Sequence, residues 1–334
     1  MRTLILLAVL CCSYHLSMSR QGLTMQYQYH LADSVAEIYN GHSVQSLKLL
    51  ADKLTKPFEN NELKYRSIFS WVCHNIAVDY RLVTLNQHQR KKLKGQPQRL
   101  KEWNQEIAGK VFRNLLEERK TLCTGYAYLI HELCAFSGIE SEIVNGFVRD
   151  VKHQQTAPVM PNHSWNAVKI NGTWYMTDAT WSSGIFDLRN KVFVPQFDES
   201  YFLVEPDLFF QDHIPIDWKT TDSIVTLDQM RILNGPVIYK GLIKHRLKLL
   251  KPLKRDTQLT SGESLTIVME APVDIKPEEF QLITRHRDLP VTLEKLPHGK
   301  WKMTWVPKKK GRYTIHLLLN KDYLASFDSE VGPL

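Results

Sequence analysis

A predicted β-hairpin constrains the fold of this chain more than any other feature. It covers Pro161 to Trp181, with the sequence PNHSWNAVKINGTWYMTDATW. Asn171 and Gly172 lie between two runs rich in β-branched and aromatic residues, and Asn-Gly at such a place is the strongest short-range signal for a two-residue turn with positive φ at both positions. We therefore expect Ile170 to face Thr173 across the turn, which sets the register of both strands.

This register brings one imidazole and one carboxylate together. It places Trp165 opposite Asp178, and His163 opposite Thr180. Side chains alternate between the two faces of a strand, so His163 and Trp165 share a face and Asp178 lies on it, diagonal to His163. A diagonal neighbour is within side-chain reach, about 7 Å away. Unless a bulge shifts the register, the hairpin holds an Asp–imidazole pair, although one such pair alone is also typical of a solvated polar face.

The sequence RKTLCTGYAYLIHELCAFSGIE, upstream of the hairpin, predicts a helix. Its apolar residues recur at helical spacing, namely Tyr126, Leu129, Ile130, Leu133 and Phe136. Gly138 stands where a helix of this length would stop. Cys123 then lies at the first turn, where unpaired backbone N–H groups and the helix dipole favour the thiolate. Cys134 lies inside the helix and is expected to be a small buried hydrophobe.

A nucleophile, a base and an orienting acid thus appear in three consecutive elements. Cys123 lies on the helix, His163 on one strand and Asp178 on the next. Cysteine nucleophiles are activated by a neighbouring imidazole that a third group holds in place. The order of the three residues is a more specific signal than any one of them, and it predicts nucleophilic catalysis.

The first residues, MRTLILLAVLCCSYHLSMSR, predict export. A basic residue, an apolar run and small residues at Ser17 and Ser19 are typical of a secretory signal. We expect residues 1–19 to be removed and the protein to be secreted or periplasmic. A lipoprotein modified at Cys11 is the alternative, but the bulky Leu10 before it fits poorly. No other segment has the roughly 18 continuous apolar residues that a membrane span needs.

The composition is that of an ordinary globular protein, with 334 residues, 43% hydrophobic and 23% charged. This length argues for two domains or one large domain. The formal net charge of +8 leaves open a contact with an acidic surface or a polysaccharide. After signal removal the cysteines are Cys73, Cys123 and Cys134, so at least one thiol is free or pairs between chains, and a Cys73–Cys134 disulfide stays open.

Two further segments indicate the organisation of the first half. Helical spacing of apolar residues predicts helices between 24 and 58, and another helix that ends near Asn75. The basic stretch from Gln87 to Trp103 contains Gly95 and Pro97, which favour a solvated loop over a continuous helix. The alternative for this stretch is a contact with an acidic partner.

The second half of the sequence has a strand-like rather than a helical pattern of apolar residues. From residue 257 to the C-terminus, short strand-like runs separated by turn signals predict a small β-sandwich of the immunoglobulin-like type. The basic stretch at 234–256 is expected to be a connector, a helix or strand packed between the domains, with a membrane-surface role as the alternative. The sequence has no glycine-rich nucleotide fingerprint, and its basic clusters lack interleaved aromatic residues, so we expect no nucleic-acid partner.

Four motifs resemble one family. LCTGYAYLIHEL and NHSWNAVKINGTWYMTDATW resemble the core of the transglutaminase-like superfamily, papain-related enzymes with a Cys-His-Asp triad. WVCHNIAVDY and YFLVEPDLFFQDHIPIDW are similar to its kyphoscoliosis-peptidase-like branch and the secreted bacterial relatives of that branch. The resemblance covers about Asn61 to Trp218. It implies an α+β fold, with a nucleophile helix packed on an antiparallel sheet, in a catalytic domain at 20–233.

The resemblance also implies roles for single residues. Cys123 would be the nucleophile, His163 the general base and later acid, and Asp178 the residue that holds the imidazole. Family members often use an aromatic oxyanion donor upstream of the nucleophile, and Tyr80 is the best-placed match. Trp165 would either shape the substrate groove or pack within the hairpin. No cofactor or metal is expected, because the chain lacks the dense carboxylate clusters of a calcium site.

Three functions are compatible with these patterns. The favoured one is a secreted cysteine peptidase or amidase that acts on a protein or peptide through a thioester. The second is an amine acyltransferase that cross-links proteins, which the missing calcium cluster disfavours. The third is a binding or scaffold protein that keeps the triad by descent, and whose effect would survive a Cys123→Ala substitution.

Overall fold

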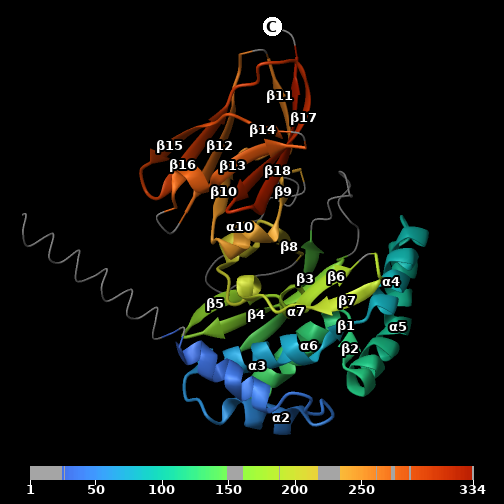
Figure 1. Ribbon diagram of the computed structural model, residues 1–334. Coiled ribbons are helices and arrows are strands. Elements are labelled where there is room, and N and C mark those ends of the chain that lie inside the picture. The colour runs from blue at the N-terminus through green and yellow to red at the C-terminus, as the bar shows by residue number, and fades with distance from the viewer. Residues whose placement is uncertain are drawn as a thin grey trace, which may run out of the picture.

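The computed structural model describes residues 25–332, apart from 26, 149–160, 188, 217–233, 261, 272–274 and 286. Figure 1 shows a mixed helical and sheet part that contains the N-terminal half, and a strand-rich part that contains the C-terminal end. The signal peptide predicted at 1–19 lies outside the described residues. Within the described ranges, no helix is both long enough and apolar enough to cross a membrane.

Helices cover one side of the first part. Helical residues at 27–38 and α2 (Leu47–Thr55) occur where apolar spacing predicted helices, and α3 (Asn61–Asn75) ends at the predicted residue. The side chain of Asn60 caps α3 by accepting a hydrogen bond from the backbone N–H of Glu62. Most of α3 is buried in a core that it shares with α2 and α6 (Cys123–Phe136).

The basic stretch at 87–103 is not the solvated loop that the sequence predicted. It belongs to two helices, α4 (Tyr80–Lys92) and α5 (Pro97–Glu118), with a short break between them. Gly95 adopts a φ of +79° in that break, and Pro97 begins α5, where its missing N–H costs nothing. The prediction that Gly95 and Pro97 interrupt a continuous helix is therefore confirmed. The prediction of a loop was wrong, because the residues before and after this break are helical.

A four-stranded antiparallel sheet faces the helices, in the order β5-β4-β3-β8. Its strands are β3 (Ser141–Val148), β4 (His163–Ile170), β5 (Thr173–Thr177) and β8 (His213–Pro215). The β4–β5 register is the predicted one, with Ile170 opposite Thr173. The turn between them has φ values of 52° at Asn171 and 84° at Gly172, both positive as expected. Helix α6 packs against β3 and β4, which confirms the α+β arrangement.

Short elements complete the first part. They are β1 (Ala77–Val78) paired in parallel with β2 (Lys120–Thr121), α7 (Ala179–Ser183), the β6–β7 ribbon (Gly184–Asp187 and Val192–Pro195), the 3-10 helix η1 (Glu199–Tyr201) and α8 (Pro206–Phe209). Strand β2 leads directly into α6, and α7 follows directly from β5. The elements that carry Cys123 and Asp178 are thus tied to the sheet by very short connections.

The C-terminal part is a β-sandwich, as predicted. One sheet has the order β10-β12-β16-β15, and the other has β11-β18-β17-β13-β14 with β9 also paired to β18. The strands are β9 (Val237–Ile238), β10 (Lys248–Lys251), β11 (Asp256–Leu259), β12 (Leu265–Glu270), β13 (Phe280–Thr284), β14 (Arg287–Asp288), β15 (Thr292–Leu296), β16 (Lys300–Trp305), β17 (Gly311–Leu319) and β18 (Asp322–Val331).

The segment at 234–256, expected as a connector, contributes β9 and β10 to the two sheets of the sandwich. Between these strands lies α10 (Lys240–Lys244), which packs against both β18 and η1. Two neighbouring residues of this short helix are buried in different cores: Leu242 in that of the sandwich, and Ile243 in a cluster beneath the four-stranded sheet. The segment therefore belongs to both parts of the molecule.

Candidate active site

Cys123 is the first residue of α6, as the sequence predicted. The N–H groups in the first turn of a helix have no partner within the helix, so they favour negative charge on the thiol. Gly125 allows this turn to lie close to β2, because a Cβ on Gly125 would come within 2.0 Å of the Thr121 hydroxyl oxygen. Packing therefore requires glycine at position 125, and this close contact keeps Cys123 at the junction of β2 and α6.

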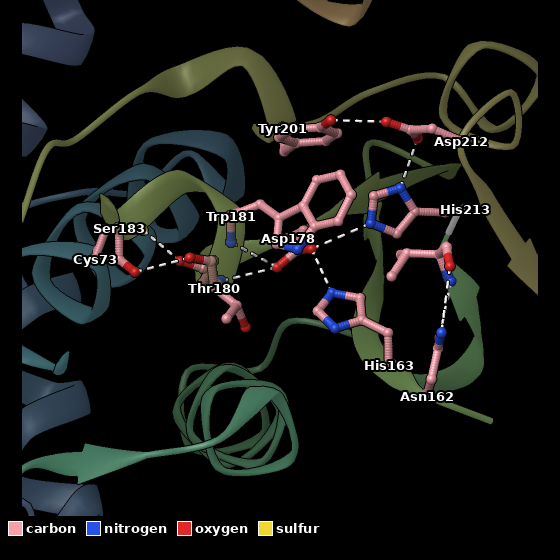
Figure 2. Close-up of polar contacts among 12 residues, drawn as sticks. Cys73, Asn162, His163, Asp178, Thr180, Trp181, Ser183, Tyr201, Asp212 and His213 are labelled. Carbon is pink, nitrogen blue, oxygen red and sulfur yellow. Dashed lines mark hydrogen bonds and ion pairs between the residues drawn. The ribbon is translucent and has the colours of Figure 1, made fainter. Parts of the chain in front are cut away.

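His163 and Asp178 form the predicted pair. Nε2 of His163 lies 2.6 Å from Oδ2 of Asp178, and both side chains are buried (Figure 2). The other carboxylate oxygen, Oδ1, accepts hydrogen bonds from the backbone N–H groups of Thr180 and Trp181, at 2.8 and 3.1 Å, and so caps α7. Because Oδ1 is held by the helix cap, the carboxylate cannot turn away from His163 without uncapping α7.

The electrostatics of Cys123 and His163 favour an ion pair. Burial raises the pKa of the Cys123 thiol, but the charge of His163, hydrogen bonding with His163 and the backbone of Ser164 outweigh it and lower the pKa overall. Burial lowers the pKa of His163, but Asp178 and Cys123 outweigh it and raise the pKa from 6.5 to about 10. Burial opposes ionisation of Asp178 as well, yet His163 and His213 hold the pKa of its carboxyl far below its usual range. A thiolate next to an imidazolium is the state that these shifts favour.

Arg90 is a cation beside the nucleophile that the sequence analysis did not single out. It belongs to α4, and its Nη2 donates a hydrogen bond to the carbonyl oxygen of Pro161 at 2.6 Å, just before β4 begins. Burial lowers the pKa of the Arg90 guanidinium, while its interaction with Cys123 opposes that effect. The basic stretch therefore delivers a positive charge to the active site, which a loop prediction could not indicate.

Three more polar residues lie behind Asp178, and the sequence analysis missed them all. Nε2 of His213 lies 3.1 Å from Oδ2 of Asp178, and Nδ1 of the same ring lies 2.6 Å from Oδ1 of Asp212. The hydroxyl of Tyr201 donates to Oδ2 of Asp212 at 2.7 Å. All three lie within the motif YFLVEPDLFFQDHIPIDW, so a family resemblance pointed to this region without indicating what its residues do.

The aromatic residues expected at the site have different surroundings. Trp165 is 1% exposed, and its ring lies 6.1 Å from that of His163 and 5.7 Å from that of Phe209. Trp165 is thus a buried residue that packs against residues inside and outside the hairpin, and its role in a substrate groove stays a prediction. Tyr80 is the first residue of α4, and its ring lies 6.0 Å from that of Phe186 on the β6–β7 ribbon. Its role as an oxyanion donor stays a prediction.

A metal could in principle be held by His163, Asp178 and His213, whose ligand atoms all lie within 4.8 Å of one another. However, two ligands of a tetrahedral zinc ion are about 3.3 Å apart, whereas the His163–Asp178 distance of 2.6 Å is that of a hydrogen bond. The geometry fits a hydrogen-bonded cluster, and we assign no metal to it. The remaining thiols, Cys73 and Cys134, are free and buried rather than joined in a disulfide.

The segment that contains Cys123, His163 and Asp178 is similar to known proteins. Residues 48–179 match the family model of the transglutaminase-like superfamily. The kyphoscoliosis peptidase of Mus musculus is 30% identical over 198 residues, which cover 58% of this chain and 26% of that protein. Its counterpart in Homo sapiens is 30% identical over 170 residues, covering 50% of this chain and 23% of that protein. The chain therefore spans about a quarter of the length of these relatives.

More distant similarities were also found. The cytokinesis protein 3 of Saccharomyces cerevisiae is 26% identical over 159 residues, covering 46% of this chain and 18% of that protein. A crystal structure of a TGase aligns with a TM-score of 0.27 and 14% identity, covering 46% of this chain and 32% of the other. The Lin-41 filamin domain aligns with a TM-score of 0.22 and 11% identity, covering 29% of this chain and 97% of the domain.

The family match and the geometry lead to the same residues. The matched range contains Cys123, His163 and Asp178, the three side chains that the structure brings together. The expected kinship with secreted bacterial proteins stays a prediction, since the relatives named above come from animals and yeast. Residues 48–179 of this chain are therefore a transglutaminase-like domain.

Proposed function

We propose that this protein is an exported cysteine peptidase or amidase that cleaves a peptide or carboxamide bond through a thioester on Cys123. The observation that carries the proposal is the arrangement of three groups: a thiol at a helix N-terminus, an imidazole beside it, and a buried carboxylate 2.6 Å from the far nitrogen of that imidazole. Each group has the environment that its role requires.

The first half of the reaction forms the thioester. The Cys123 thiolate attacks the carbonyl carbon, a C–S bond forms, and the carbonyl electron pair moves to oxygen. The C–N bond then breaks, and His163 gives its proton to the departing amine. Because Nε2 of His163 is bonded to Asp178, Nδ1 is the ring nitrogen left for this transfer. Asp178 holds the ring while its charge changes.

The second half releases the acid. Neutral His163 takes a proton from a water molecule, whose oxygen attacks the thioester carbonyl. The C–S bond breaks, and its electron pair returns to sulfur as the thiolate beside the imidazolium, which restores the starting state. If an amine replaced the water, the same steps would form an amide, so the acceptor alone separates a hydrolase from an acyltransferase.

Stabilisation of the oxyanion is assigned to the start of α6. The backbone N–H of Cys123 belongs to the first turn, whose N–H groups point at the negative charge that develops on the carbonyl oxygen. The Tyr80 hydroxyl is proposed as a second donor. Its Cα is fixed next to the N-cap of α4, where the Asp79 side chain accepts hydrogen bonds from the backbone N–H groups of Arg81 and Leu82.

Hydrolysis is preferred over amine transfer because two relatives at 30% identity carry the name peptidase. Those names describe longer proteins, so the substrates of the relatives are not transferred to this chain. A protein or peptide substrate is proposed from the carbonyl chemistry, and export from the N-terminal signal. Fractionation of cells that express the full chain, with N-terminal sequencing of the product, checks the export and the predicted loss of residues 1–19.

The experiment that tests the enzyme proposal is the pH dependence of Cys123 alkylation by iodoacetamide, followed by mass spectrometry of the Cys123 peptide. An ordinary thiol titrates near pH 8.5, whereas a thiolate paired with an imidazolium reacts well below pH 7. We expect the wild type to show this acid limb and His163→Ala to lose it. An ordinary thiol curve in both proteins would remove the basis for catalysis and favour a scaffold protein.

A second measurement separates the two enzyme classes. The protein is incubated with a peptide mixture, with and without a labelled primary amine, and the products are analysed by mass spectrometry. New peptide termini, or carboxamides converted to carboxylates, without incorporated label identify a hydrolase, whereas incorporated label identifies an acyltransferase. Cys123→Ala, which lacks the sulfur and should fold as the wild type does by circular dichroism, is the matched control and should give neither product.

A further inference from the structure

The fourth strand of the sheet brings a second imidazole to Asp178. His213 lies on β8, which is separated from the His163 strand by β3. Nε2 of His213 lies 3.1 Å from Oδ2 of Asp178, the same oxygen that His163 contacts at 2.6 Å (Figure 2). One carboxylate oxygen is thus shared between two imidazole rings.

The surroundings of His213 favour a doubly protonated ring. Its second nitrogen, Nδ1, lies 2.6 Å from Oδ1 of Asp212, so each nitrogen faces a carboxylate oxygen. An ionised carboxylate only accepts hydrogen bonds, and both ring nitrogens must therefore carry hydrogen to satisfy both contacts. Oδ2 of Asp212 already accepts from the Tyr201 hydroxyl at 2.7 Å, which fixes the orientation of this carboxylate toward His213.

Aromatic rings enclose this imidazolium. The ring centroids of Phe209, Trp181 and Trp165 lie 4.1, 4.7 and 5.1 Å from that of His213, and His213 is 0% exposed. Aromatic faces attract a cation at such distances. Burial lowers the pKa of His213, but Asp212 and Asp178 outweigh it and raise the pKa overall. The surrounding aromatic rings therefore exclude water from His213, while its two carboxylate neighbours favour the positive charge of the ring.

We propose that His213 is a positioning residue for the reaction assigned above: it holds the same oxygen of the Asp178 carboxylate that His163 contacts and withholds part of its negative charge from that ring. The inference rests on the proposed function, because it concerns how strongly His163 keeps its proton. A carboxylate shared with a second imidazolium stabilises the His163 imidazolium less than an unshared one. His163 can then release its proton to a leaving amine more readily.

Several titratable and charged groups surround the two imidazoles. Three of them contact the rings or each other: Asp178 at the end of β5, Asp212 before β8 and Tyr201 on η1. The others are Cys123 on α6, Arg90 on α4, which interacts with Cys123, and Cys73 and Tyr65 on α3, which interact with Asp178. Burial raises the pKa of Cys73, Tyr65 and Tyr201 well above their ordinary values, so these three stay neutral over the working range. The charges that remain are those of Arg90, the triad, His213 and Asp212.

The test replaces the cation but keeps a donor. In His213→Gln a neutral amide can still donate to Asp178, so the change removes the charge with little change in volume. Loss of a positive charge makes it harder for Cys123 and for His163 to lose a proton, so it raises the pKa of both groups. At the ring separation of 5.5 Å between His163 and His213, we expect the His163 pKa to rise by about one to two units, and the acid limb of Cys123 alkylation to move up by about one pH unit.

Two readouts are used on the full chain. Alkylation of Cys123 gives the acid limb, and NMR of ¹³C-labelled histidine at about pH 10, near the His163 pKa of about 10, reports how much of this ring is protonated. The wild type should be partly deprotonated there, and His213→Gln fully protonated. His245→Gln is the matched control. Nε2 of His245 also lies close to a carboxylate, 2.8 Å from Oδ2 of Asp322, but His245 is the C-cap residue of α10, a helix that carries none of the triad residues. This variant should leave both readouts unchanged.

The outcomes are distinguishable. A wild type without a His163-dependent acid limb overturns the proposed function itself. A wild type with that limb, together with an unmoved limb in a folded His213→Gln, overturns only the role of His213, even if alkylation becomes slower at every pH. If His213→Gln does not fold, as judged by circular dichroism, His213→Asn repeats the test with a smaller neutral amide. It should shift the limb in the same direction, and an unmoved limb there also overturns the proposal.

Discussion

Oδ2 of Asp178 lies 2.6 Å from Nε2 of His163, so the carboxylate holds the nitrogen that points away from the nucleophile. This contact determines which nitrogen carries the hydrogen when the ring is neutral. Nε2 keeps its hydrogen for Asp178, and Nδ1 is free to take a proton from the thiol or from water. The consequences of this choice can be tested by changing Asp178 and its neighbours.

Replacing Asp178 with Asn should impair the ion pair more than the fold. An amide can still cap α7 through its oxygen, but it offers His163 no negative charge and can present an N–H to the ring instead. We expect the rate of Cys123 alkylation near pH 6 to fall at least about tenfold. Circular dichroism should stay close to that of the wild type. An unchanged alkylation rate would mean that Asp178 does not support the His163 imidazolium.

The pH dependence of stability should reveal the coupling between Cys123 and His163. If the folded pair is the proposed thiolate and imidazolium, it holds one proton between pH 6.5 and 9, and the unfolded pair also holds one, as the thiol. The pair therefore adds no slope to the free energy of unfolding in this window. In Cys123→Ser no thiolate forms. Burial lowers the pKa of His163 and Asp178 raises it, and we expect the effect of Asp178 to prevail in this variant.

In that variant the contribution of His163 has the usual sign for a raised pKa. It is fully present below pH 6.5 and is lost as the pH rises through the folded pKa. Urea titrations of Cys123→Ser should show the free energy of unfolding falling with pH by up to about 1.4 kcal/mol per unit relative to the wild type. The double variant Cys123→Ser/His163→Ala should lose this extra slope. If it persists there, another group causes it.

Gly146→Ala should destabilise the sheet at the strand that separates the two histidines. A Cβ on Gly146 would lie 2.2 Å from the carbonyl oxygen of Ile214 and 2.4 Å from Cη2 of Trp165. Both neighbours are held by the sheet and the core, so relief requires backbone movement, and we expect a loss of about 1–3 kcal/mol in urea unfolding. Gly109→Ala in α5, where a Cβ would meet nothing within 4 Å, should be neutral or stabilising. Equal effects of the two substitutions would exclude the steric explanation.

Arg90→Gln tests the cation that α4 brings to the nucleophile. The guanidinium interacts with the Cys123 thiolate, so its loss should raise the thiol pKa and move the acid limb of alkylation up by about half a pH unit. Arg99→Gln, on the exposed start of α5, is the matched control and should leave the limb in place. If both variants shift the limb alike, the effect comes from net charge rather than from the position of Arg90.

The local parts of the site could be predicted from sequence. The Asn171-Gly172 turn determined the register, and two-residue periodicity then placed His163 and Asp178 on one face. The helix that begins at Cys123 was predicted by apolar spacing and by Gly138, which has a φ of +71°. In each case a short stretch of chain contained all the information that the prediction needed.

The parts that depend on long-range packing could not be predicted. His213 reaches Asp178 only because the short strand β8 pairs with β3, from which it is separated by more than sixty residues in the chain. No periodicity can be detected in a strand of this length. Helix α5 was missed for a different reason: it buries few side chains, notably Leu100, Val111 and Leu115, so its apolar stripe is sparse among many polar residues.

Helix α10 makes the two parts of the molecule interdependent. Leu242 completes the core of the sandwich, while its neighbour Ile243 closes the cluster that contains Trp165 and Phe209, two of the rings around His213. A fragment that ends before β9 would expose those rings to water and raise the local dielectric around the imidazole network. The sandwich thus affects the electrostatics of the triad without supplying a residue to it, because α10 links its core to the cluster around His213.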